Sequence, residues 1–133
     1  MKVLLNILLV FIIMNLGTFI VYGGTSAIFG LQPPNDGPPA QFMISVLLVK
    51  VGMALGFVLL FVLARGFWVG SWLTYAFIWW VMYSIVEIGQ AVAPNYSALD
   101  AGAGIVAEAV YFPLSAFITA RLLREKGPGA TSA

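Results

Sequence analysis

Four long runs of apolar residues divide this chain, and polar or Gly- and Pro-containing segments separate them. The runs cover residues 3–22, 42–64, 67–91 and 101–123. A helix rises about 1.5 Å per residue, so each run reaches roughly 30 Å, the thickness of the hydrocarbon core of a bilayer. The pattern predicts four transmembrane helices in a single domain, residues 1–126, followed by a short flexible tail, residues 127–133.

The first apolar run has a second interpretation, because Lys2 precedes it and small residues follow it from Gly23 to Ala27. This arrangement resembles a secretory signal peptide. The apolar region of such a peptide usually spans about 7–15 residues, and the run here is longer. We therefore expect a retained helix, followed by a loop over Gly23–Gln41, where four prolines and several glycines disfavour a helix.

Composition supports the membrane interpretation. Hydrophobic residues make up 62% of the 133 positions and charged residues 8%, and the mean hydropathy is +1.02. Soluble domains contain about 25% charged residues, so this chain has too little polar surface for one. The predicted fold class is an all-α integral membrane protein, an antiparallel bundle of four transmembrane helices that has the lipid bilayer as its first partner.

The basic residues predict the orientation of the bundle. Five of them fall on one side of the predicted topology, and the two long loops on the other side hold only Asp36 and Asp100. Positive residues favour the cytoplasmic side, so we expect both termini in the cytoplasm and a plasma-membrane location. The net charge of +1 gives no indication of nucleic-acid binding. The five basic residues are Lys2, Arg65, Arg121, Arg124 and Lys126.

The chain contains neither cysteine nor histidine, which excludes several chemistries. Disulfides, thiol redox relays, haem held by histidine or cysteine, zinc sites built on those ligands, and hydrolases with a serine–histidine pair are all ruled out. We expect no cofactor and no metal site, and no spacing of residues identifies a catalytic group.

Three charged residues lie inside the apolar runs: Lys50 in the second, Glu87 in the third and Glu108 in the fourth. In the predicted topology Lys50 lies roughly 13 Å, Glu108 roughly 10 Å and Glu87 roughly 5–8 Å from the outer ends of their helices. Asn15 of the first run reaches a similar depth. These four residues are the candidate polar cluster, or ligand or proton site, in the outer half of the membrane.

The cluster has a structural and a functional interpretation. Lys50 and Glu108 can form an ion pair that holds two helices together, or the cluster can bind a substrate, an ion or a proton, as intramembrane charges often do. In the functional case, Glu108 is the group expected to titrate. Separately, Gly52 and Gly56 have the spacing that allows close helix packing.

Three functions fit these features. The first is a non-enzymatic accessory or assembly subunit that forms homo-oligomers or joins a larger membrane complex. The second is an oligomeric transporter of a small solute, proton-coupled through Glu108. In size and helix count the chain resembles the small multidrug resistance transporters, although Asn15 stands near where that family carries its essential glutamate. The third is a membrane enzyme that acts on a lipid-like or polycyclic substrate, with Glu108 or Glu87 as acid or base.

Overall fold

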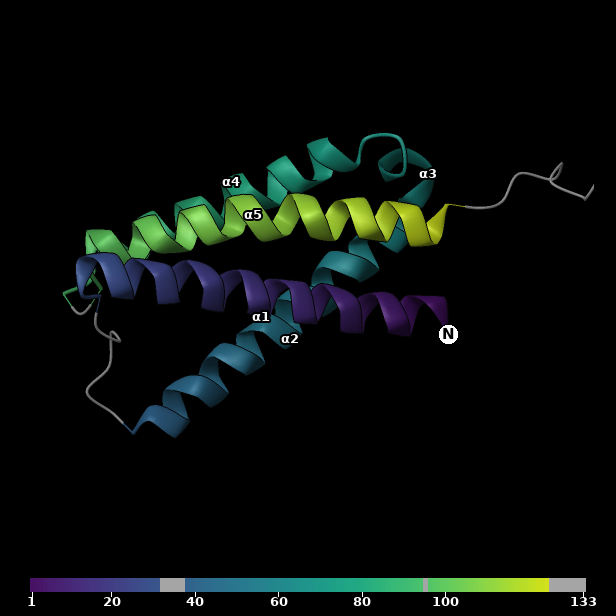
Figure 1. The fold of residues 1–133 in the computed structure, drawn as a ribbon. Helices are drawn as coiled ribbons and strands as arrows, with labels where there is room; N and C mark the ends of the chain where they lie inside the picture. The colour runs from purple at the N-terminus through teal and green to yellow at the C-terminus, as the bar shows by residue number, and fades with distance from the viewer. Residues whose placement is uncertain (32–37, 95, 125–133) are drawn as a thin grey trace, which may run out of the picture.

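The computed structural model describes residues 1–31, 38–94 and 96–124. All regular secondary structure within these ranges is helical, with no strand. The elements, shown in Figure 1, are α1 (Lys2–Phe29), α2 (Pro39–Leu63), α3 (Arg65–Trp68), α4 (Trp72–Ala91) and α5 (Ala98–Leu123). The predicted tail, Lys126 and Asp36 lie outside the described residues.

Within the described residues, three helices are long and apolar enough to cross a membrane: α1, α2 and α5. An all-helical chain with three such helices is typical of a membrane-embedded protein. The fourth predicted span corresponds to α4, which has 20 residues, and its crossing of the membrane stays a prediction.

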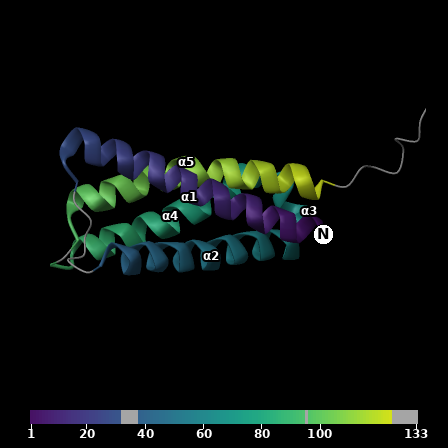
Figure 2. The ribbon, with the colours of Figure 1, turned by 60° about the horizontal axis from the view of Figure 1, so that its bottom comes forward.

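Helix α5 is the central element of the bundle. It packs against α1 and against α4, whereas α2 packs mainly on α1. Neighbouring long helices run in opposite directions, so the N-terminus, α3 and the end of α5 gather at one end (Figures 1 and 2). The N-terminal half of α2 diverges from α1 in Figure 1, which leaves the bundle wider at its other end.

Helix α1 continues to Phe29, so the first part of the predicted loop, residues 23–29, is helical. Local propensity favoured an end near the glycines, but the hydroxyl of Tyr22 donates to the backbone carbonyl of Asp100 at 3.1 Å and ties this turn to α5. The helix ends where Gly30 adopts φ 67°, a left-handed conformation that glycine accepts easily.

Helix α5 begins at Ala98, three residues before the predicted start at residue 101. A helix that starts at residue 101 would have Asp100, a common capping residue, at its N-cap position. The structure shows instead that Ser97 is the N-cap and that Asp100 is its partner within the first turn. Ser97 Oγ accepts from the Asp100 amide at 3.0 Å, and Asp100 Oδ2 accepts from the Ser97 amide at 3.1 Å.

The third predicted span, residues 67–91, is divided in two. The single turn α3 is followed by residues 69–71 outside any helix, and only then does α4 begin. Gly66 lies within α3 and Gly70 within the break, and each lowers helix stability by about 1 kcal/mol relative to alanine. The connection between α2 and α4 is therefore longer than the two residues that the sequence indicated.

Aromatic rings fill the space between α2, α4 and α5 at the end of the bundle that holds α3. The Phe57 ring lies 5.3 Å from the Trp79 ring and 5.8 Å from that of Phe112, centroid to centroid. Within the described residues, the α2 and α4 backbones do not approach closely, so these large rings span the distance. This aromatic cluster comprises Phe57, Phe61, Tyr75, Trp79 and Phe112.

The interface of α1 with α5 is close and partly polar. A Cβ atom on Gly17 would lie 3.1 Å from Tyr111 Cβ, so glycine allows the two helices to approach here. Further along, the hydroxyl of the fully buried Thr119 donates to Asn6 Oδ1 at 3.2 Å. Glycine and hydrogen-bonded polar groups at this contact are typical of helix pairs in membranes.

Candidate functional site

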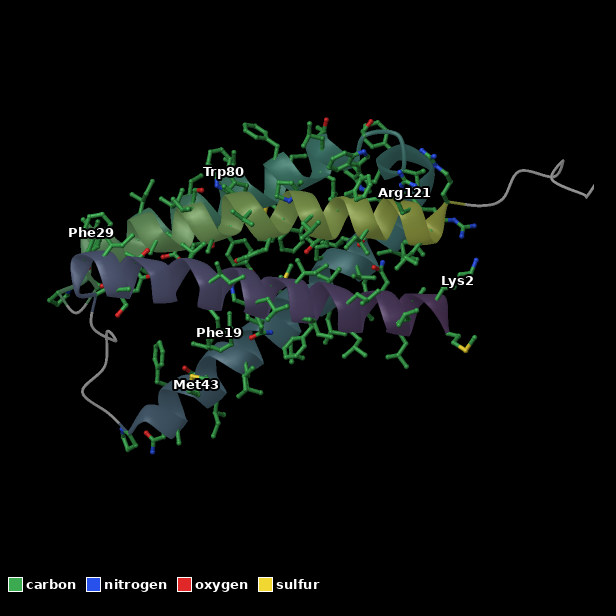
Figure 3. All side chains as sticks on the ribbon, in the orientation of Figure 1. Lys2, Phe19, Phe29, Met43, Trp80 and Arg121 are labelled. Atoms are coloured by element: carbon green, nitrogen blue, oxygen red, sulfur yellow. The ribbon has the colours of Figure 1, made fainter. Side chains whose placement is uncertain are left out.

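A cavity of about 690 Å³ lies in the wide end of the bundle. The C-terminal half of α1, the N-terminal half of α2, the end of α4 and the beginning of α5 surround it. Figure 3 shows Phe19 of α1 and Met43 of α2 in the gap where these two helices diverge. Both side chains line the cavity and both are partly exposed, so the cavity has an open side between α1 and α2.

The cavity has one apolar wall and one polar wall. Phe42, Met43, Val46 and Val49 of α2 supply much of the apolar wall. The polar wall comes mainly from α4, α5 and the segment between them. It comprises Glu87, Gln90, Tyr96, Asp100, Glu108 and Tyr111.

Lys50 of α2 lies at the boundary between the two walls. Its Nζ donates to the hydroxyl of Tyr111 at 2.9 Å and lies 4.4 Å from the centre of the same ring. No direct ion pair joins Lys50 to Glu87 or Glu108 among the residues that the structure describes. The hydrogen-bond partner of the lysine is thus a tyrosine, and the interaction of Lys50 with the glutamates is through space.

Glu108 of α5 is the most deeply buried acid of the cavity, with 3% of its surface exposed. One carboxylate oxygen, Oε2, is buried and has no hydrogen-bond partner within the described residues. Buried polar atoms are usually hydrogen-bonded, so an unpaired carboxylate oxygen beside a cavity is typical of a ligand site.

Glu87 of α4 sits against α5 at a glycine. A Cβ atom on Gly104 would lie 2.5 Å from Glu87 Cδ, so only glycine leaves room for this carboxylate. Glu87 Oε2 accepts from the hydroxyl of Tyr96 at 2.5 Å, and the Tyr96 oxygen lies 3.2 Å from that of Tyr22. Burial, together with the bond to the Glu87 carboxylate, raises the pKa of Tyr96 above its usual range, so Tyr96 keeps its proton and acts as a donor.

The structure brings three of the predicted cluster residues to one cavity: Lys50, Glu87 and Glu108. Asn15 does not line that cavity; it is buried, and its Nδ2 donates to the Phe11 carbonyl of its own helix at 2.8 Å. Serine, threonine and asparagine in helices commonly bond in this way to the preceding turn.

The two glycines of α2 have different surroundings. A Cβ atom on Gly52 would meet no other side chain or helix within 4 Å, whereas one on Gly56 would lie 3.6 Å from the Trp79 ring. Gly56 therefore faces the aromatic cluster, and Gly52 contacts no other helix among the described residues.

Sequence reasoning missed three tyrosines of the site: Tyr22, Tyr96 and Tyr111. Tyr111 carried a usable signal, because it follows Glu108 by three residues and so shares its helix face. Tyr22 and Tyr96 carried none. They meet because the end of the first predicted span, at Tyr22, lies against the segment that precedes α5, a tertiary contact that neither stretch of sequence indicates.

Comparisons with protein-family models, with curated proteins and with solved structures give no match to this chain. Its class therefore rests on its own features, and these are an all-helical fold with three long apolar helices, as in membrane-embedded proteins.

Proposed function

We propose that the chain is a four-span membrane protein with both termini in the cytoplasm, in the plasma membrane. Lys2, Arg65, Arg121 and Arg124 support this topology, because all four belong to the end of the bundle that holds the N-terminus and α3 (Figures 1 and 3). Asp100 belongs to the opposite end. In this orientation the cavity opens towards the outer face and, between α1 and α2, towards the outer leaflet.

We further propose that the protein is a non-enzymatic module that binds a small amphipathic molecule in this cavity. The observation that carries the proposal is the cavity of about 690 Å³ itself, with an apolar wall on α2 facing a charged wall on α4 and α5. Ligand sites typically have volumes of roughly 300–1,000 Å³ and combine apolar surface with a few placed polar groups.

A tryptophan introduced into the apolar wall tests this proposal. Val46 lines the cavity, and the bulky ring of Val46→Trp should occupy space beside the apolar wall that a bound ligand needs. In lipid nanodiscs, we expect the wild-type protein to bind dodecanoylglycerol, a neutral single-chain amphiphile, saturably, and Val46→Trp to bind it about tenfold more weakly or worse. Native mass spectrometry across a titration measures both affinities.

Leu47→Trp is the matched control, because Leu47 is the next residue of α2, is 38% exposed and does not line the cavity. This variant should bind as the wild type does. Equal affinities of the wild type and Val46→Trp, or the absence of saturable binding to the wild type, would contradict the proposal.

Transport is a second candidate function, and the unpaired oxygen of Glu108 is the observation that favours it. A buried carboxylate beside a cavity is the kind of group that couples a proton to a solute in transporters. Transport would also require a path from the cavity to the cytoplasmic end of the bundle in the proposed topology, past the aromatic cluster that packs between α2, α4 and α5.

A further inference from the structure

From the charges that line the cavity, we infer that its ligand is a zwitterionic lipid headgroup, an ammonium and a phosphate a few bonds apart, attached to an acyl chain. This inference rests on the proposed binding function and specifies its ligand. The juxtaposition that supports it is Lys50 on the α2 side of the cavity and the acids Glu87 and Glu108 on the α4 and α5 side.

The acidic wall favours the ammonium. Glu108 Oε2 and Asp100 Oδ1 are buried without hydrogen-bond partners within the described residues, and the two side chains are only 3% and 5% exposed. Both line the cavity. A primary ammonium has three N–H donors, so it can bond to Glu108 and still reach a neighbouring acceptor. A quaternary ammonium has no such donor.

Lys50 favours the phosphate. An ammonium side chain has three N–H donors, and the only hydrogen bond that Lys50 Nζ donates within the described residues goes to Tyr111. Two donors are therefore left for an oxygen anion in the cavity, and phosphate is a common partner for lysine.

A ligand with one charge fits less well than a zwitterion. A simple cation bound at Glu108 would place its charge in the same cavity as Lys50, and a simple anion at Lys50 would face the carboxylates of Glu87, Asp100 and Glu108. Like charges at short range in an apolar setting are strongly unfavourable. A headgroup that carries both charges meets each wall with the opposite sign.

The cavity also has an apolar side that can accommodate the acyl chain. Phe19, Met43 and Val49 line the cavity and are 46%, 40% and 58% exposed, so they form an apolar exit between α1 and α2. Figure 3 shows Phe19 and Met43 of this exit. In the proposed topology this exit opens into the outer leaflet. A single-chain or double-chain lipid could keep its headgroup in the cavity and its chain in the membrane.

The test compares four single-chain ligands against the wild-type protein in phosphatidylcholine nanodiscs: lysophosphatidylethanolamine, lysophosphatidylcholine, lysophosphatidic acid and dodecylammonium. We expect lysophosphatidylethanolamine to bind at least about tenfold more tightly than each of the others, since each of the others lacks a charge or an N–H donor. Native mass spectrometry gives the four affinities.

Two variants assign the charges to residues. Glu108→Gln should weaken the binding of lysophosphatidylethanolamine and of dodecylammonium by about tenfold. The same variant should bind lysophosphatidic acid as tightly as the wild type does, or more tightly. Lys50→Met should weaken the binding of the three ligands that carry a phosphate and leave the binding of dodecylammonium unweakened. Ser115→Ala is the control, because Ser115 is fully buried on the same helix as Glu108 and does not line the cavity. If Lys50→Met fails to fold, the wild-type ligand series still decides the matter.

A competition experiment with a water-soluble headgroup distinguishes a lipid ligand from a small free solute. Phosphoethanolamine, which has the same headgroup without a chain, should compete poorly; competition at the same concentration as the lysolipid would overturn the assignment to a lipid. Equal or tighter binding of a singly charged ligand would overturn the headgroup assignment while the proposed binding function stands. If no amphiphile binds at all, both fail.

Discussion

Replacing Lys50 with methionine should lower the free energy of unfolding by about 3 kcal/mol, and adding Glu108→Gln should restore much of that loss. Among the residues that the structure describes, Lys50 is the only basic one that lines the cavity, and the acids Glu87, Asp100 and Glu108 line it as well. Without the lysine, these carboxylates face one another with no opposite charge. Neutralising Glu108, the most buried of them, removes part of that repulsion.

The coupling is measured as a double-mutant cycle, in which sodium dodecyl sulfate unfolds each protein in mixed micelles. The four proteins are the wild type, Lys50→Met, Glu108→Gln and the double variant. Lys2→Met is the matched control, because Lys2 is exposed at the other end of the bundle, and its effect should stay within about 0.5 kcal/mol. A double mutant no more stable than Lys50→Met alone would show that the two charges are not coupled.

Replacing Phe57 with alanine should destabilise the protein by a similar amount, about 3 kcal/mol. The Phe57 ring is fully buried and contacts Tyr75, Trp79 and Phe112 at centroid distances of 4.8, 5.3 and 5.8 Å. It connects α2 to α4, whose backbones do not approach closely within the described residues. Alanine would leave a hole that the rigid neighbouring rings fill poorly.

The same unfolding titration measures the effect, and Phe77→Ala is the control. Phe77 is on α4 and is 57% exposed, so its loss should change the free energy of unfolding by about 0.5 kcal/mol or less. Equal effects of the two substitutions would mean that the aromatic cluster does not hold α2 to the rest of the bundle.

The positions of the helices could be predicted from the sequence, because an apolar run long enough for a bilayer is visible without tertiary information. The ends of the helices could not. Gly23 and Gly24 predict the end of α1, yet the helix continues to Phe29, past Tyr22, whose hydroxyl is bonded to Asp100, 78 residues further along the chain. Ser97 and Asp100 had a clearer local signal, the residue types of a capping box three positions apart.

In the candidate site, too, some residues could be predicted from the sequence and others could not. Lys50, Glu87 and Glu108 could be identified because each is a charge inside an apolar run, and such residues are rare. Their partners depend on how each helix is rotated about its axis, which no run of residues specifies. Lys50 was expected to pair with Glu108, but the structure bonds it to Tyr111, one turn further along α5. The chain has five tyrosines, and an uncharged aromatic residue in an apolar run does not stand out.

Photolabelling tests the central claim, that the cavity binds an amphipathic molecule, most directly. A lysophosphatidylethanolamine with a diazirine early in its chain would be bound in nanodiscs, irradiated and mapped by peptide mass spectrometry. The label should appear at cavity residues such as Thr18, Val46 and Ala107 and should disappear with excess unlabelled ligand. Labelling that excess ligand does not reduce, spread over exposed residues outside the cavity such as Leu59 and Leu60, would contradict the claim.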